Sequence, residues 1–388
     1  MTGWIERELG DILKLNYGWS LPEKKRIAGD VPVYGSNGVV GTHNYPLVNS
    51  VGLIIGRKGS AGNVHYSLKP FCPIDTTFFI APEDTKLDIE FLYYLLRHID
   101  LRRILGDVGV PGLNREMAYK EQAKFPEAKD EQQKIAAVLG MVQRAIEQQE
   151  RLLAVTAELK KTLLHKLFTE GLRGEPQKQT EIGFVPESWE VVTFGSLIED
   201  APQVSMRSDA DRKIEYVDVS SISREFLCIE STSSYVLKEA PGRARKKVKT
   251  GDVIFATVRP TLLRIAHVPA AYDEQICSTA FCVLRDNNKR TLGRFIYYLV
   301  QREKFVKQLA AIESGASYPA VTDRQIKEQL VPVPQESEQI EIAATLEACD
   351  GKTRMLRRKH MAFTDLLRTL LHQLMTAQIS VHDLNLPE

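Results

Sequence analysis

The chain has 388 residues, of which 43% are hydrophobic and 26% charged, and its formal net charge at pH 7 is +1. This composition is typical of a globular protein. The net charge excludes a polycation that coats nucleic acid indiscriminately. The sequence also contains no run of about 18 apolar residues that could span a bilayer.

The first predicted element is a globular block over residues 1–126. Its opening, MTGWIERELG, carries acidic residues and no apolar run, so we expect no signal peptide. Short apolar runs between turn residues at 31–41, 51–66 and 76–82 predict strands, and FLYYLL at 91–96 predicts a helix. The block is therefore expected to be mixed α/β.

The segment GRKGSAGN at 56–63 invites comparison with a phosphate-binding loop. It lacks the GxxxxGK[ST] spacing, and its glycines fall at every third residue without the GxGxxG pattern. We interpret it as a turn between strands with exposed basic residues.

A long helix is predicted over 127–170, followed by a linker at 171–185. Asp130 is a suitable N-cap, and Gln133 adds a partial capping box. Pro126 precedes the helix, and Gly171 fits a C-cap after it.

A second block is predicted over 186–334. Strands are expected at 213–222, 251–268 and 278–284, and a helix at FIYYLV, 295–300. A second long helix, with Ser337 as its N-cap, is expected over 335–377, and a tail over 378–388.

The two halves form an internal repeat. EQQKIAAVL at 131–139 matches EQIEIAATL at 338–346, a shift of 338 − 131 = 207, with six identities in nine positions. TLLHKLFT at 162–169 matches TLLHQLMT at 369–376 at the same shift. Such a repeat predicts that one design, a block followed by a helix, occurs twice.

Both long helices carry an apolar seam with alternating steps of three and four residues, which predicts a coiled coil. The expected apolar seam residues are Leu139, Val142, Ile146, Leu153, Leu163, Leu167, Leu346, Leu356, Phe363, Leu367, Leu370 and Leu374. Gln149, Thr156 and Lys160 interrupt the first seam, while Leu152 and Leu159 are expected to widen its apolar stripe. Polar seam residues such as Gln149 and Lys160 can fix the register.

The direction of this helix pairing stays open in the sequence. A pseudo-twofold relation between the halves favours an antiparallel pair, because each helix then leaves its own block and runs towards the other. A parallel pair needs a connection that runs back along the helices, and here that connection contains a whole block.

Recognisable catalytic motifs are missing. There is no GxSxG, no HExxH and no NPPY or DPPY run of the kind that amino-methyltransferases use to hold a flipped base. His165 and His372 occupy matching repeat positions, but each is a lone helical histidine, for which packing is a better explanation than metal binding. The five cysteines are odd in number and show no CxxC spacing. We therefore expect no cofactor, no metal, no disulfide framework and a reduced, cytoplasmic protein.

Basic and amide-bearing turns give each block the chemistry of DNA recognition. Arginine and lysine suit guanine, asparagine suits adenine, and neighbouring cations hold phosphates. Duplex DNA repeats about every 34 to 36 Å, so two readers on one side of it need a fixed separation. The expected DNA-binding residues are Lys24, Lys25, Arg26, Tyr34, Ser36, Asn37, Arg57, Lys58, Ser60, Asn63, Arg115, Arg207, Arg243, Arg245, Lys246, Lys247, Lys249, Arg259, Thr261 and Arg264. For any single one, a solvated surface role is the alternative.

In this order, several segments resemble the specificity subunits of type I restriction-modification systems over essentially the whole chain. They are PVYGSNGVVG at 32–41, GRKGSAGN, VPGLNREMAYKEQ at 110–122, TEIGFVPESWEV at 180–191 and the doubled helix segments. The resemblance implies an α+β architecture: two mixed α/β target recognition domains separated by two long antiparallel coiled-coil helices, with a pseudo-twofold internal repeat.

The resemblance also implies function and partners. Each recognition domain would read half of a split, asymmetric target in double-stranded DNA. Two methyltransferase subunits would dock on the helices and domains, restriction subunits would join for cleavage, and the chain itself would not be catalytic.

Two rival interpretations remain. The chain can instead be a helical adaptor that joins two identical partners without touching DNA, in which case any DNA binding should lack the steep salt dependence of phosphate contacts. It can also be an enzyme with an unrecognised site.

Overall fold

The structure is a computed structural model that describes residues 3–105, 112–205, 210–287, 292–315 and 317–381. The chain forms two compact units, the first from Met1–Arg151 with Arg357–Glu388 and the second from Leu152–Leu356. Each unit mixes helices and strands, which confirms the predicted fold class. Among the described residues, no helix has the length and apolar character needed to cross a membrane.

In the first unit, β1 pairs antiparallel with β9, and two sheets have the strand orders β2-β8-β5-β6 and β4-β3-β7. The strands are β1 Trp4–Glu8, β2 Asn16–Tyr17, β3 Val31–Gly35, β4 Gly38–His43, β5 Gly52–Gly56, β6 Val64–Ser67, β7 Cys72–Pro73, β8 Thr77–Ile80 and β9 Gln122–Pro126. The helices are α1 Leu9–Ile12, α2 Ile89–Ile99 and α3 Arg115–Tyr119, together with parts of α4 (Lys129–Thr169) and α8 (Glu336–Met375).

The core of the first unit lies on both faces of β5, because successive strand residues point to opposite sides. Leu53 and Ile55 belong to a cluster with Phe91 of α2, whereas Ile54 packs with Phe71 on the other face. All these side chains are fully buried. A strand covered on both faces explains the unbroken apolar run of its sequence.

In the second unit, β12 pairs with β21, and two sheets have the orders β13-β20-β17-β18 and β15-β14-β19-β16. The strands are β10 Gln177–Thr180, β11 Gly183–Pro186, β12 Glu190–Thr193, β13 Ile198–Glu199, β14 Lys213–Val217, β15 Ser233–Val236, β16 Ala244–Lys247, β17 Val253–Ala256, β18 Ile265–His267, β19 Ile276–Ser278, β20 Phe281–Asp286 and β21 Leu330–Val333. The helices are α5 Gly293–Leu299, α6 Glu303–Ile312 and α7 Asp323–Lys327, together with parts of α4 and α8.

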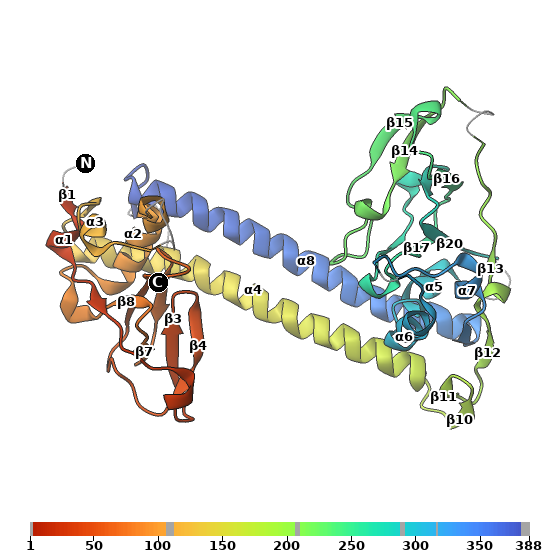
Figure 1. Ribbon diagram of the computed structural model, residues 1–388, viewed down its shortest axis with the longest axis horizontal. Coiled ribbons are helices and arrows are strands. Elements are labelled where there is room, and N and C mark those ends of the chain that lie inside the picture. Colours follow the sequence, from red (N-terminus) through yellow and green to blue (C-terminus); the bar gives the residue numbers. More distant parts are fainter. Residues whose placement is uncertain (1–2, 106–111, 206–209, 288–291, 316, 382–388) are drawn as a thin grey trace. The chain divides into compact units, whose positions relative to one another are not determined.

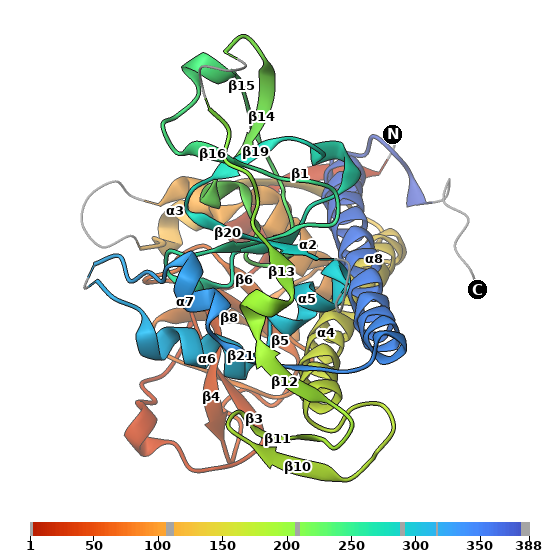
Figure 2. The same ribbon diagram turned by 90° about the vertical axis from the view of Figure 1, so that its right-hand side faces the viewer.

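The strand β17 plays the same part here as β5 does in the first unit. Helix α5 lies against β17, β18 and β20; α5 and β20 are labelled in Figure 2. Val253 and Phe255 join the cluster that contains Phe295 of α5, while Ile254 faces the opposite cluster with Cys277. The two units therefore share the arrangement of a buried strand beneath one helix.

Helix α4 is unbroken over 41 residues and helix α8 over 40 residues (Figure 1). Within the second unit, Lys160 contacts Asp350 and the backbone N–H of Leu172 donates to Glu338. Moving forward along α4 thus means moving backward along α8, so the two helices run antiparallel there. This geometry settles, within that unit, the direction that the sequence leaves open.

Every position of the predicted seam frame is buried or half-buried in its own unit. The polar members Gln149 and Thr156 are only 8% and 9% exposed. In contrast, Leu152 and Leu159 are 39% and 50% exposed, so the expectation that they widen the stripe is wrong. Together with Val155, which is 66% exposed, they form an apolar row on the outer side of α4.

The helices begin slightly earlier than expected. Gln132 N–H already donates to the Ala128 carbonyl, so Asp130 lies in the first turn and is not the N-cap. Ser337 likewise lies in the first turn of α8, because Glu338 and Gln339 donate to the Gln335 carbonyl. Gly171 does follow α4 in a left-handed conformation, with φ of +67°.

Two buried glutamines attach the helix starts to their units. Gln132 donates to Pro126 O (2.9 Å) and accepts from the backbone N–H of Asp88 (2.9 Å). Gln339 donates to Pro334 O (3.0 Å) and accepts from the backbone N–H of Leu292 (3.2 Å). The same hydrogen-bond pattern therefore occurs in both units.

Indole–carboxylate bonds accompany the glutamines. Trp4 Nε1 donates to Glu131 at 3.3 Å, and Trp189 Nε1 donates to Glu338 at 3.1 Å. The Glu-Gln pairs at 131–132 and 338–339 are among the identities of the internal repeat. The helices are thus fixed to their units by residues that the sequence repeats.

A neighbouring contact differs between the units. In the first, a Cβ on Gly140 of α4 would lie 2.6 Å from a carboxylate oxygen of Glu90 on α2 and 3.2 Å from Arg144. In the second, Arg294 of α5 forms an ion pair with Glu347 of α8. The carboxylate at this contact thus belongs to the short helix α2 in the first unit (Glu90) and to the long helix α8 in the second (Glu347).

The boundary between the two compact units falls inside both long helices, at Arg151/Leu152 in α4 and Leu356/Arg357 in α8. The domain limits expected from the sequence, at 126, 170, 185, 334 and 377, therefore stay a prediction.

Candidate nucleic-acid interface

The turn after β5 carries Arg57 and Lys58 at the surface of the first unit. The backbone N–H groups of both residues donate to the Thr76 carbonyl, at 2.9 and 3.1 Å. Gly59 and Gly62 have positive φ values of 74° and 80°, which this tight turn requires. The turn is therefore held in one conformation with its basic residues at the tip.

The Arg57 guanidinium lies 5.3 Å from the ring centroid of Tyr17, which is 50% exposed. Its Nη2 donates to the Asp75 carbonyl at 2.6 Å, and its Nε is buried with no hydrogen-bond partner among the described residues. Arg115, at the start of α3, lies over the same ring, also at 5.3 Å. Two arginines thus share one exposed tyrosine, in cation–π contacts worth roughly 0.5–1 kcal/mol each at exposed sites.

A matching pair follows β17 in the second unit. The Arg259 guanidinium lies 5.0 Å from the ring centroid of Tyr318, which is 71% exposed. Arg259 Nη2 donates to the Ser317 carbonyl at 3.1 Å, and its backbone N–H donates to Pro319 O at 2.7 Å.

Arg259 has the left-handed φ of 50°, and Leu263 closes the turn with φ of 51°. For residues with a side chain this conformation costs roughly 1–2 kcal/mol, and such residues concentrate at functional sites.

The two turns occupy equivalent places in their units. Lys58 forms a β-bridge with Gly112, two residues before the N-cap of α3, and Val258 forms one with Ala320, two residues before the N-cap of α7. In the first unit the turn thus joins β5 to the segment that leads into α3, and in the second it joins β17 to the segment that leads into α7. An arginine–tyrosine pair therefore stands at this turn in both units, although the tyrosine comes from the end of β2 in the first unit and from the segment between α6 and α7 in the second.

The residues expected to bind DNA differ in the exposure of their side chains. Those with exposed side chains are Lys24, Lys25, Asn37, Lys58, Arg243, Lys249, Arg259 and Thr261. Those that are half-buried are Arg26, Tyr34, Arg57, Ser60, Asn63, Arg115, Arg245, Lys247 and Arg264. Arg207 lies outside the described residues.

Several of these side chains hold the fold together. Lys246 is 9% exposed, donates to Phe281 O and pairs with Asp323. Arg264 donates to the carbonyls of Val219 and Ile222 at 2.9 and 2.7 Å.

Ser36 is 8% exposed and donates to Thr76 O, and Arg26 donates to Val40 O. For Lys246, Arg264, Ser36 and Arg26, the geometry favours structural roles over contact with a ligand.

The basic run at 243–249 is largely strand β16, in which side chains alternate between the two faces. Ala244 and Lys246 point into the unit, while Arg245 and Lys247 are half-buried, and Lys247 pairs with Glu274. Arg243 and Lys249 remain as the exposed cations of this run.

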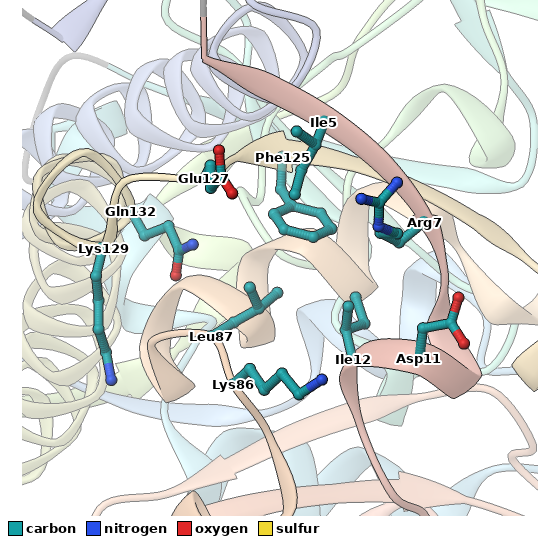
Figure 3. Close-up of a pocket in the computed structure, with 10 residues that line it drawn as sticks. All are labelled: Ile5, Arg7, Asp11, Ile12, Lys86, Leu87, Phe125, Glu127, Lys129 and Gln132. Atoms are coloured by element: carbon teal, nitrogen blue, oxygen red, sulfur yellow. The ribbon is translucent and has the colours of Figure 1, made fainter.

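A cavity of about 480 Å³ lies beside the start of α4 in the first unit (Figure 3). Arg7, Lys86 and Lys129 line it together with Asp11 and Glu127, so its charges nearly balance. Its lining holds no histidine, cysteine or hydroxyl side chain that could act as a nucleophile.

Tyr17 and Tyr318 are the residues that sequence patterns did not single out. Each arginine lies far from its tyrosine in the chain, so no local spacing joins them. The available signal is an aromatic residue between turn formers, in NYGWS at 16–20 and GASYP at 315–319.

Comparisons with known proteins agree with two related units. A family model described as "Type I restriction modification DNA specificity domain" matches residues 1–156 and 186–361. The type I restriction enzyme MjaVIII specificity subunit of Methanocaldococcus jannaschii is 22% identical over 358 residues, which cover 89% of this chain and 83% of the relative. The EcoDI specificity subunit of Escherichia coli is 20% identical over 370 residues, 89% of this chain and 80% of the relative.

The fold is shared with a solved structure. The crystal structure of the type I restriction-modification system S subunit from M. genitalium matches with a TM-score of 0.67 at 16% identity and covers 96% of each chain.

Proposed function

The chain belongs to the type I restriction modification DNA specificity family, and from that premise we propose that it reads DNA sequence for a type I restriction-modification complex. The observation that carries this proposal is the doubled match of the family domain, at residues 1–156 and 186–361. Each matched part has its own exposed basic turn, and the turns differ in sequence. Two different readers suit a target with two unlike halves.

The long helices suit a spacer between the half-sites. At 1.5 Å per residue, helices of 41 and 40 residues are about 60 Å long. We expect the buried seam residues to fix the register of the two helices and thereby to keep the gap between the half-sites constant.

The same helices offer a surface for partner subunits. Leu152, Val155 and Leu159 form an apolar row on α4, which is unusual on a helix that packs its other side. Two methyltransferase subunits are the partners we propose for the complex, with restriction subunits added for cleavage. In this scheme the chain supplies recognition, and its partners supply the chemistry.

A cytoplasmic location fits the thiols. All five cysteines are free, and Cys72, Cys277 and Cys282 are buried in the units. Reduced thiols are typical of the cytoplasm.

The proposal is tested by expressing the chain with its methyltransferase subunit in cells without other adenine methylation and mapping methylated adenines across the genome. We expect methylation at one split, asymmetric motif with a constant gap. Methylation at scattered sites without a shared motif would overturn the proposal.

A further inference from the structure

We propose that the two arginine–tyrosine pairs, Arg57 with Tyr17 and Arg259 with Tyr318, are base readers and that each recognises a guanine in its own half-site. This inference rests on the proposed function and names the chemistry by which each unit reads. It assigns a specificity-determining role to two tyrosines and to one particular arginine per unit.

The first support is positional. Both arginines stand directly in the turn that follows the buried central strand, and each turn bridges to the segment before a short helix. The turns otherwise share no sequence, since one is GRKGSAGN and the other TVRPTLLR. The tyrosines reach these turns from different elements, β2 in the first unit and the segment between α6 and α7 in the second. The same kind of contact is thus built twice by different routes, which points to a shared task.

The second support is the state of the guanidinium groups. Among the hydrogen bonds of the described residues, each group uses one N–H, towards the carbonyl of Asp75 or of Ser317. Each arginine carries five N–H donors. Although the Nε of Arg57 is buried, the N–H groups of Nη1 and the second N–H of Nη2 are left for a ligand. Guanine presents N7 and O6 in the major groove at the spacing of such a pair.

The third support is preorganisation. The stacked ring and the carbonyl bond hold each guanidinium plane in place before any DNA arrives. An arginine that is already oriented loses less conformational freedom on binding than a free surface arginine. A cation that only neutralises phosphate has no need of such orientation, and the exposed neighbour Lys58 suits that role.

The units also differ in a way that predicts unlike half-sites. Tyr17 carries two arginines, Arg57 and Arg115, whereas Tyr318 carries Arg259. The first unit therefore presents a second guanidinium close to the first, but Arg115 also forms an ion pair with Glu116 at 3.3 Å, so we assign the guanine reader of this unit to Arg57.

The test uses Arg57→Lys and Arg259→Lys in the full chain with its methyltransferase subunits, followed by methylome mapping. Lysine keeps the charge but replaces the planar two-donor edge of the guanidinium with a single ammonium group, which also contacts guanine but is less rigidly oriented. We expect each variant to weaken its preference for guanine at one position of one half-site, by up to roughly 150-fold, and to leave the other half-site unchanged. An unchanged motif, or methylation that falls equally at every site, would show a surface or phosphate contact and overturn the inference.

A second measurement works on the purified complex. Replacing the recognised guanine by 7-deazaguanine removes the N7 acceptor and should weaken wild-type binding by roughly 5- to 150-fold. The Arg259→Ala complex, which has no donor for N7 at this position, should bind both oligonucleotides equally when the replaced guanine is the one in the second half-site. Equal binding of both by the wild type at every guanine of the half-site would refute the inference.

The tyrosine is tested with a matched pair of variants. Tyr318→Phe keeps the ring under Arg259, so the motif should stay as in the wild type, whereas Tyr318→Ala should relax the same position as Arg259→Lys. Because Tyr318 is 71% exposed, neither change should unfold the chain. Lys307→Ala on α6, an exposed cation paired with Glu303, is the control and should leave the motif intact.

The outcomes separate the two proposals. A wild-type motif that is split but lacks guanine in a half-site contradicts the reader assigned to that unit and leaves the proposed function standing. Scattered wild-type methylation contradicts the proposed function itself.

Discussion

Gln132 shows how one side chain can decide the attachment of a long helix. It is 2% exposed, and its amide joins the end of β9 to the start of α2 through two hydrogen bonds. Leaving a buried partner without its bond costs roughly 1–3 kcal/mol. Gln339 occupies the same place in the second unit and is fully buried.

We therefore expect Gln132→Leu to lower the free energy of unfolding by about 2 kcal/mol or more, since two buried backbone groups lose their partner. Chemical denaturation monitored by circular dichroism measures the change. Gln133→Leu is the matched control, because Gln133 is exposed on the same turn and its loss should change stability by less than about 0.5 kcal/mol. Equal effects of the two variants would contradict the role of Gln132.

At this scale the sequence predicts residue types better than residue contacts. The repeat marks Glu131 and Gln132 as special, but the pattern around them suggests helix capping by Asp130, whereas the structure uses both residues to hold the unit. The contact between Tyr17 and Arg57 cannot be predicted from the sequence either. It depends on a distant part of the chain, since Thr76 accepts the backbone hydrogen bonds of the turn and Phe78 of β8 lies under the Arg57 guanidinium.

At the scale of the elements, the polar seam residue Lys160 contributes to the pairing of α4 with α8 in the second unit. Lys160 of α4 lies 2.7 Å from Asp350 of α8, donates to Gln301 at 3.2 Å and stands over the ring of Tyr298. Tyr298 in turn donates to Asp350 at 2.9 Å, and burial together with the Asp350 charge raises the pKa of its phenol. The interruption of the first seam at Lys160 is thus satisfied inside the second unit.

We expect Lys160→Met to destabilise the chain by about 1.5–3 kcal/mol, the range of hydrogen bonds to charged groups, because Asp350 is left half-buried and loses its cation. The double variant Lys160→Met with Asp350→Asn should recover most of the loss, since asparagine keeps an acceptor for the Tyr298 hydroxyl and leaves no uncompensated charge. Thermal unfolding of both variants measures this recovery. Lys161→Met, at the exposed neighbouring position, is the control, and a double variant less stable than the single one would contradict the explanation.

The repeat position of Lys160 in the other helix is Leu367, at the shift of 207, and it is buried in the first unit's core. There the cation is Arg97 of α2, which donates to Gln143 of α4 at 3.2 Å. Periodicity predicts which positions face the seam because it depends only on 3.6 residues per turn. The partner that satisfies a polar seam residue depends on a third element, α5 or α2, which periodicity does not report.

For the whole molecule, the helices give the proposed spacer a measurable length. Seven residues added to both helices, beside Ala154 and beside Met355, keep the seam frame and lengthen each helix by about 10.5 Å. We expect the gap between half-sites to grow by about three base pairs at 3.4 Å per pair, while the bases read stay the same. Methylome mapping detects the change. Adding the seven residues to α4 alone is the control, which should lower stability, and a constant gap in the double insertion would show that the helices do not set it.

The architecture of the whole chain was accessible from the sequence because a repeat, apolar runs and turn residues are all local signals. The reading surface was accessible only in outline. Of the basic residues expected there, Lys246 and Arg264 serve the fold, because strand alternation and loop packing, and not composition, decide which cations reach the surface.

The opposite charge order at the two helix junctions bears on whether the two blocks are interchangeable. Glu90 lies beside Arg144 in the first unit, and Arg294 pairs with Glu347 in the second. A copy of the first block in place of the second would set Glu90, which stands at the repeat position of Arg294, against Glu347, and two carboxylates repel each other. We therefore expect a chain with the first block duplicated to be less stable than one in which each block keeps its own long helix.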